Sequence, residues 1–267
     1  MLSFIKNKLS PNLSHLKWLV TLEVLVLLVL SVSVLLYFSR QLLRQEAISD
    51  AKEVLDATVQ NIDNVMLTVE QTVDNFYPDL QRHLGQPERM MAYSRKIVES
   101  NSYIAGCAIS LTPNYYEDRE LFMAYVKRED ASFVTLDKIG SKPYTEQEWF
   151  THPITSGMAC WLDPMKEAEN GKEAFTTFCH PITDPSGKMV GVVSVDLSIN
   201  MLSEVIHLDK SSPNGYSVLL TSDGSYVVHP NAIRQTQHTV FTRPDDADNP
   251  ALKEASKAIM VGETGYK

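Results

Sequence analysis

The chain has 267 residues, 44% hydrophobic and 21% charged, which is typical of a globular protein with one large or two small domains. Its 33 acidic residues outnumber its 24 basic residues and give a net charge of −9, which argues against a nucleic-acid partner. Cys107, Cys160 and Cys179 form no CxxC zinc motif and are too few for a disulfide scaffold. One disulfide with one free thiol, or three buried thiols, are both open.

An apolar stretch near the N-terminus predicts a membrane-spanning helix. Trp18 to Phe38 contains 21 residues, which as a helix measure about 31 Å and match the hydrocarbon core of a bilayer. The stretch lacks a small-residue cleavage pattern, so we expect a retained signal anchor over 18–38. Lys6, Lys8 and Lys17 precede it and favour a cytoplasmic segment 1–17, with the rest of the chain outside the cytoplasm.

Residues 39–84 predict a long stalk helix, because this segment has one proline, Pro78, and no glycine. Apolar or small residues recur there with a 3-4 heptad spacing. They are Ile48, Ala51, Leu55, Thr58, Ile62, Val65, Val69, Thr72 and Phe76, and a second row is Val59, Met66, Val73 and Leu80. The stripe fits a helix packed on its own domain, and it equally fits one that also pairs with a second copy in a homodimer.

Residues 85–207, here the first module, predict an α+β unit with an antiparallel sheet. We expect helices over 90–100, 145–152 and 197–207, and strands over 103–111, 121–127, 132–139, 173–183 and 188–195. Residues 208–267, the second module, begin a similar hairpin, YSVLLT-SDG-SYVVH, with the hairpin signal Asp223-Gly224. The second module has too few strands to close a sheet, so we expect the chain to be the N-terminal part of a longer protein.

One acid follows a strongly apolar run. Met189 to Val195 reads as a buried strand, and Asp196 comes directly after it. A buried carboxylate needs partners to offset its lost hydration. Asp196 could therefore cap a helix that begins at Leu197, or it could end its strand at the wall of a ligand pocket.

The order of these segments resembles the double Cache (dCache_1) extracellular sensor domains of bacterial transmembrane receptors. The matching strings are YTEQEWFTHP, WLDPM, FCHPITDPSGKMVGVVSVDLS, GYSVLLTSDGSYVVHPN and GETG, and the resemblance covers about residues 40–267. It implies two tandem PAS-like modules, the first membrane-distal and the second membrane-proximal and incomplete. It further implies an inner-membrane location with a periplasmic bulk, a homodimer through the stalk helices, and a cytoplasmic output domain outside this chain.

The resemblance also implies a small-molecule site in the first module. Trp149, Phe150 and Asp196 match its ligand-contact positions, and a carboxylate beside aromatic rings suits an ammonium group. Gln147 stands where amino-acid-binding members carry an arginine, and Met165 stands where a tyrosine is expected. An amine, an amino-acid-like compound and a neutral polar metabolite are therefore all candidate ligands.

Tyr125 and Tyr144 are further candidates for the ligand site, and either could instead pack in the core. No cofactor is expected. Three His-Pro pairs lack the spacing of a zinc site, and the acidic loop at Asp245, Asp246 and Asp248 offers at most a weak calcium site.

The sequence contains no G-x-S-x-G, H-E-x-x-H or P-loop motif, so we expect no enzyme in this segment. The resemblance allows a chemotaxis module, a histidine kinase, a cyclic-dinucleotide enzyme or a PP2C-type phosphatase as the output of the full-length protein. The alternatives to a sensor are a membrane-tethered periplasmic hydrolase and a structural or adhesion spacer.

Overall fold

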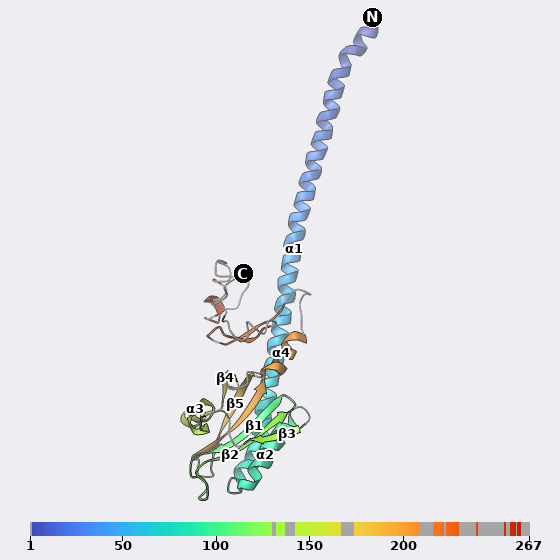
Figure 1. Cartoon of the computed structure of the whole chain (residues 1–267). Coiled ribbons are helices and arrows are strands. Elements are labelled where there is room, and N and C mark those ends of the chain that lie inside the picture. Colours follow the sequence, from blue (N-terminus) through green and yellow to red (C-terminus); the bar gives the residue numbers. More distant parts are fainter. Residues whose placement is uncertain are drawn as a thin grey trace. The chain divides into compact units, whose positions relative to one another are not determined.

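The computed structural model describes residues 2–129, 132–136, 142–166, 174–208, 216–221, 223–229, 239, 254, 257–259 and 261–262, and Figure 1 shows the elements in chain order. The chain divides into two compact units, Met1–Glu53 and Val54–Lys267. The first unit is entirely helical where it is described. The second contains both predicted modules and the C-terminal part of the stalk helix.

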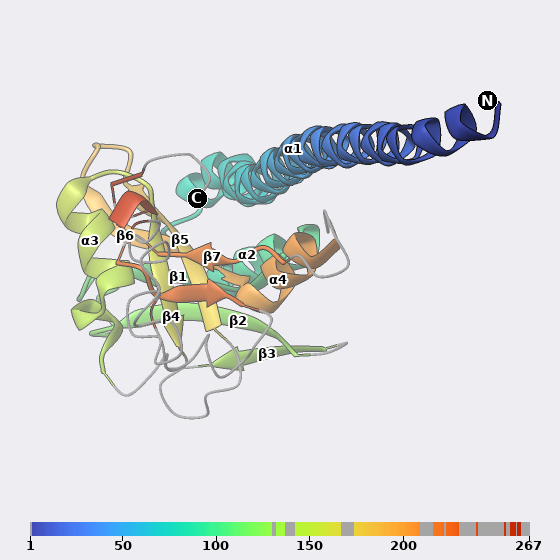
Figure 2. The same cartoon turned by 90° about the horizontal axis from the view of Figure 1, so that it is seen from above.

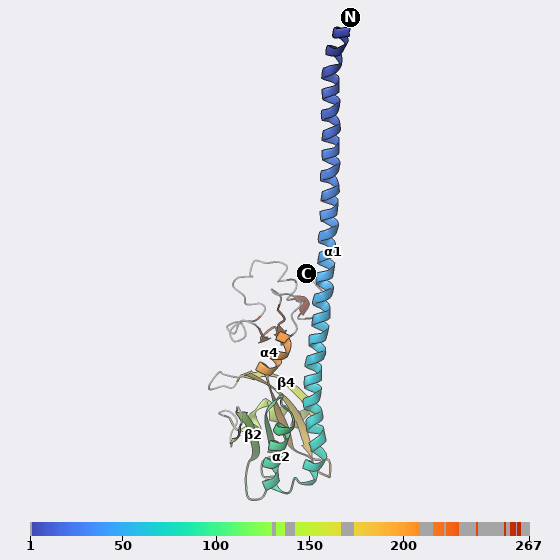
Figure 3. The same cartoon turned by 90° about the vertical axis from the view of Figure 1, so that its right-hand side faces the viewer.

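The predicted anchor and stalk are one helix, α1 (Leu2–Arg82), seen along its length in Figure 3. Its apolar stretch near the N-terminus is long enough to cross a membrane, and none of that stretch is buried. The retained signal anchor over 18–38 stays a prediction. The helix ends just before Gly85, close to the predicted boundary.

The first module is built on a six-stranded sheet with the order β3-β2-β1-β6-β5-β4, and all neighbouring strands are antiparallel. The strands are β1 (Ile104–Leu111), β2 (Phe122–Glu129), β3 (Ser132–Leu136), β4 (Cys160–Lys166), β5 (Ala174–Thr183) and β6 (Met189–Ser198). The α+β prediction is confirmed, and five of these strands were predicted.

Strand β4 was missed in the sequence because Asp163 and Pro164 interrupt its apolar pattern. The pairing of β4 with β5 shifts register between Leu162 and Met165, and this irregularity accommodates a proline that cannot donate to the ladder. The strand also lies at the edge of the sheet, where a proline is tolerated best.

Three helix boundaries also differ from the predictions, and α2 (Pro87–Ser100) begins three residues earlier than expected. The helix expected over 145–152 is a 3₁₀ turn, η1 (Tyr144–Glu146), followed by α3 (Glu148–Ser156), which continues past Pro153 and ends at Gly157 with φ 71°. The linking helix α4 (Ile199–Leu208) begins two residues later than expected.

Strand β6 runs through Asp196 to Ser198, so Asp196 neither ends its strand nor caps α4. The helix-cap interpretation and the placement of Asp196 at the strand end are both wrong.

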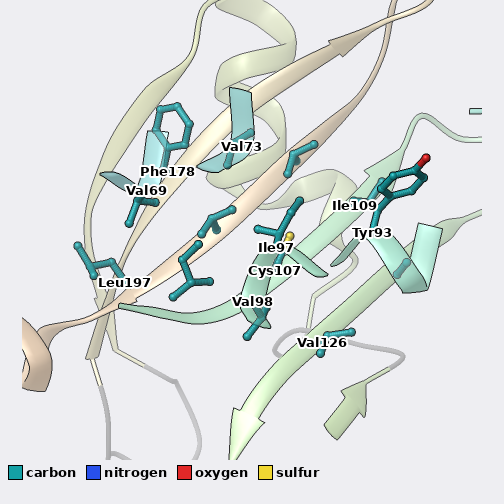
Figure 4. Packing of buried hydrophobic residues seen from close by; sticks show 14 of the residues in the cluster. Val69, Val73, Tyr93, Ile97, Val98, Cys107, Ile109, Val126, Phe178 and Leu197 are labelled. Carbon is teal, nitrogen blue, oxygen red and sulfur yellow. The ribbon is translucent and has the colours of Figure 1, made fainter. Parts of the chain in front are cut away.

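The main core lies between one face of the sheet and the helices α1 and α2 (Pro87–Ser100). Figure 4 shows Val69 and Val73 of α1 packed beside Ile97, Ile109 and strand residues of β5 and β6. Val69 is 0% exposed and Val73 is 1% exposed, whereas Leu55 is 53% exposed. The stalk helix thus packs on its own module from about Thr58 onward.

Helix α3 contacts β5 and β6, as Figure 2 also shows. Trp149 and Phe150 of α3 belong to a second buried cluster with Cys179 and Val192, separate from the main core. The sheet therefore has α1 and α2 on one face and α3 on the other.

In the second module, β7 (Leu219–Leu220) and β8 (Tyr226–Val228) form the predicted hairpin. Most of 208–267, including the acidic loop, lies outside the described residues.

Candidate functional site

Asp196 lies on the sheet face that carries α3, as the strand register shows. Directly opposed residues of antiparallel strands share a face. Asp196 is opposite Gly106 on β1 and Thr177 on β5, and Gly106 is opposite Lys127 on β2. Val192, which packs with the α3 aromatic residues, is four residues earlier on β6 and shares this face because side chains alternate. Lys127, Gly106, Asp196 and Thr177 therefore form one row across four strands.

Two hydroxyl groups hold the Asp196 carboxylate. Thr177 Oγ1 donates to Oδ1 at 2.8 Å, and the Tyr125 hydroxyl donates to Oδ2 at 3.0 Å. The side chain is half-buried, and the two hydroxyl groups fix the position of its carboxylate on this face of the sheet.

Gly106 provides the space in which this arrangement forms. A Cβ atom at position 106 would lie 2.7 Å from the Tyr125 hydroxyl and 3.0 Å from Asp196 Oδ2. Any larger residue would therefore displace the tyrosine, the carboxylate or both. Because β2, β1 and β6 are consecutive neighbours, the Lys127 and Asp196 backbones stand about 10 Å apart across Gly106.

Lys127 was missed as a candidate by sequence reasoning. It is half-buried, and its Nζ atom lies 5.1 Å from the centroid of the Phe175 ring. The signal was present in the alternation of FMAYVK, since Lys127 is in phase with Tyr125 on the same strand. The row therefore holds one cationic and one anionic side chain.

Three aromatic rings form a cover on the same face of the sheet. Tyr144 stacks on Trp149 with centroids 6.2 Å apart and meets Phe150 edge-on at 5.0 Å. The cover packs on Cys179 and Val192. Trp149 is 2% exposed and Phe150 is 4% exposed, so the rings serve first to hold η1 and α3 on the sheet.

The cover is fixed by hydrogen bonds at both ends. The Tyr144 hydroxyl donates to the Leu111 carbonyl at 2.6 Å and accepts from the Phe122 backbone N–H at 3.1 Å. Burial raises the pKa of Tyr144 above its usual value, which keeps the donor protonated. Gln147 accepts from Trp149 Nε1 at 2.7 Å and donates to the Lys142 carbonyl at 2.9 Å.

The predicted site residues thus fall into two groups. Tyr125 and Asp196 are bonded to each other, and Tyr144, Gln147, Trp149 and Phe150 form the cover. Asp196 is four residues beyond Val192, or about 13 Å along β6, so the carboxylate lies at the margin of the cover. Met165 is opposite Phe175 on the edge strand β4, and only its backbone is described.

Ser110 is a polar residue under the cover. It is opposite Val192 on β6 and Met123 on β2. Its side chain is 0% exposed, and its hydroxyl has no hydrogen-bond partner among the described residues. Such buried hydroxyls are uncommon in native proteins, and this one marks the part of the cover region where a further polar group would be stabilised.

Comparison with known proteins identifies the architecture. Residues 90–204 match the family model described as "methyl-accepting chemotaxis protein-like, first PDC sensor domain". The matched range contains the whole six-stranded sheet, the cover and Asp196. The first module has a PDC-type sensor fold.

Solved structures of extracellular and ligand-binding domains are similar in fold over most of the chain. The extracellular domain of a proposed histidine kinase, soHK1S-Z6, has a TM-score of 0.63 and 17% identity, and the match covers 82% of this chain and 84% of that one. The ligand-binding domain of the amino acid chemoreceptor PctB of Pseudomonas aeruginosa PAO1, in complex with L-Gln, has a TM-score of 0.51 and 19% identity, covering 70% and 69%.

A curated protein is similar to part of this chain. Methyl-accepting chemotaxis protein McpC of Bacillus subtilis (strain 168) is 23% identical over 164 residues, which are 56% of this chain and 24% of McpC. The chain therefore spans about a quarter of the length of that relative.

Proposed function

We propose that this chain is the extracytoplasmic sensing region of a membrane-bound bacterial receptor, with a double Cache architecture, and that its PDC-type module binds a small molecule at Asp196. One observation carries the proposal. A carboxylate on the covered face of the sheet is oriented by Tyr125 and Thr177, beside a glycine that leaves room for it. A core that needed only packing would carry an apolar residue there.

The chemistry of the row defines the ligand class. Asp196 accepts hydrogen bonds and supplies negative charge, so it suits an ammonium or another polar donor. Lys127 places a positive charge in the same row, and a ligand carboxylate or another acceptor is complementary to that charge. A compound that carries both groups fits the row better than a simple amine does. The related domain of PctB carries L-Gln, which is a compound of that class.

The aromatic cover supports the same site in a different way. Trp149, Phe150 and Tyr144 are tied to the sheet and to one another. Gln147 accepts a hydrogen bond from the Trp149 indole through its amide oxygen and so helps to position that ring. The cover thus bounds the ligand on its apolar side, while the row at Asp196 binds its polar end.

The α1 helix links the sensing module to the membrane. Val65, Val69, Val73 and Leu80 pack it on the module, while Leu55, Val59 and Leu67 are exposed on the same helix. We propose that these exposed residues belong to a stalk that pairs with a second copy, and that ligand binding favours one arrangement of the paired stalks. The signal would then reach an output domain of the longer protein.

A thermal-unfolding screen tests the sensing proposal. The whole chain in detergent micelles is mixed with amines, amino acids, organic acids and sugars, and unfolding is followed by circular dichroism. A ligand at about 100 times its Kd stabilises the folded state by about 2.7 kcal/mol, or about 5–10 °C for a domain of this size. Asp196→Asn should abolish the shift, and Asp163→Asn, at an exposed carboxylate on β4, should keep it.

The other two candidate functions predict different results. A spacer would show no stabilisation by any compound and would tolerate Asp196→Asn. A hydrolase would turn over a compound in the panel. The match to sensor domains favours the receptor over both.

A further inference from the structure

Cys160 and Cys179 lie directly opposite each other on neighbouring strands. They are register partners in the pairing of β4 with β5, and both are free thiols. Directly opposed residues of an antiparallel pair have Cα atoms about 4.5 or 5.5 Å apart. Both separations lie within the range of about 4.4–6.8 Å that a disulfide spans. The backbone therefore already holds the two cysteines at bonding distance.

Cys107 is not part of this pair. It lies on β1 in the main core with the α1 and α2 residues, whereas Cys179 belongs to the cluster under α3, against which Cys160 packs. The sheet itself separates Cys107 from the other two thiols. Of the three pairings that the sequence allows, the structure is compatible with one.

We propose that Cys160 and Cys179 form a cross-strand disulfide that closes the β4–β5 hairpin beneath the aromatic cover. The inference rests on the proposed function in one respect, because disulfides persist in the oxidising space outside the cytoplasm and are rare inside it. The oxidant is a disulfide, either that of a thiol oxidoreductase or oxidised glutathione. Two thiols of this chain are oxidised to one disulfide, and the donor disulfide is reduced to two thiols.

The two cysteines have different roles in the exchange. Cys160 is half-exposed and Cys179 is fully buried. The Cys160 thiolate attacks the donor disulfide and releases one donor thiol, giving a mixed disulfide. The Cys179 thiolate then attacks Cys160 Sγ, releases the second donor thiol and completes the bond. Burial raises the pKa of both thiols, so the exchange is slow without a catalyst.

The disulfide would stabilise the edge strand β4 next to the strand that carries Thr177, the hydrogen-bond donor to Asp196. Strand β4 has one neighbour only, and its pairing is irregular between Leu162 and Met165. Cys179 is two residues from Thr177, which holds Asp196, and it packs with Trp149 and Phe150. A disulfide there fixes β4 to the strand that carries both the cover contact and the Asp196 donor.

Thiol counting after controlled oxidation tests the proposal. The whole chain in detergent micelles is incubated with oxidised glutathione, then denatured, alkylated with N-ethylmaleimide and analysed by mass spectrometry. The expected result is one alkylated thiol, Cys107, and a proteolytic fragment in which Cys160 is joined to Cys179. Three alkylated thiols after prolonged incubation, or a bond that includes Cys107, would overturn the proposal.

A stability measurement with a matched variant completes the test. Closing a loop of about 20 residues should raise Tm by about 5–10 °C in the oxidised over the reduced protein. Cys160→Ser, at the half-exposed position, should remove this difference without preventing folding. A disulfide that leaves Tm unchanged would refute the stabilising role. No ligand is present, so failure here leaves the ligand-binding proposal untouched.

Discussion

Replacing Gly106 with alanine should break the hydrogen bond between the Tyr125 hydroxyl and the Asp196 carboxylate. The new methyl carbon would lie 2.7 Å from the Tyr125 hydroxyl and 3.0 Å from Asp196 Oδ2, so the tyrosine must move and its bond to Asp196 is lost. A hydrogen bond to a charged group contributes about 1.5–3 kcal/mol. Alanine also has less conformational entropy than glycine in the unfolded chain, which stabilises the folded state by about 0.4–1 kcal/mol. The net loss is about 1–2 kcal/mol.

The assay is thermal unfolding, where this loss lowers Tm by about 2–8 °C. Gly85→Ala is the matched control, because no atom lies within 4 Å of the position its Cβ would take, and it should leave Tm unchanged or slightly raised. A double-mutant cycle with Tyr125→Phe isolates the mechanism. Without the hydroxyl, Gly106→Ala should cost less, with a coupling of about 1 kcal/mol. Full additivity, or a Gly106→Ala protein as stable as the parent, would refute the reasoning.

Three further predictions concern the core, the cover and a half-buried histidine. Val69→Ala should destabilise the protein by about 2–3 kcal/mol in denaturant unfolding, because it removes two buried methyl groups and leaves a cavity. Leu67 is 49% exposed on the same helix, so Leu67→Ala should change the free energy of unfolding little. Ser110→Ala should leave the free energy of unfolding unchanged or raise it by up to about 1 kcal/mol, since its buried hydroxyl has no partner among the described residues, and a larger loss would show that it has one. Burial lowers the pKa of His180, and the Asp74 carboxylate offsets this in part, so near the pKa the folded state binds fewer protons than the unfolded state. Neutral His180 therefore contributes its full share of stability above about pH 6.5. This contribution falls as the pH drops toward the lowered pKa. Between pH 7.5 and 5.5 Tm should therefore fall more in the parent than in His180→Phe, and equal declines would contradict the assignment.

The sequence was informative where one side-chain pattern dominated. The apolar runs of β1, β2 and β6 and the heptad stripe of α1 predicted those elements to within a few residues, because burial of apolar side chains decides them. Strand β4 was not predicted because Asp163 and Pro164 are typical of loops. The strand accommodates both residues because it lies at the edge of the sheet and its pairing shifts register there. Tertiary pairing thus overrode local composition.

Part of the candidate site could be predicted from the sequence. Asp196 could be singled out as a carboxylate beside a buried run, but its partners Tyr125 and Thr177 come from strands 71 and 19 residues away, which no local pattern reveals. The role of Gly106 depends on the same non-local register. Tyr144 and Gln147 form hydrogen bonds to Leu111, Phe122, Lys142 and Trp149 that fix the cover. Their contact with a ligand stays a prediction.

The most direct test is isothermal titration of the compound with the largest thermal shift into the parent, Asp196→Asn and Asp163→Asn proteins. Loss of a charge-assisted hydrogen bond of about 1.5–3 kcal/mol should weaken binding about 10- to 150-fold in Asp196→Asn. Asp163→Asn should bind with the Kd of the parent. Unchanged affinity in a folded Asp196→Asn protein would contradict the proposal that ligand binds at Asp196.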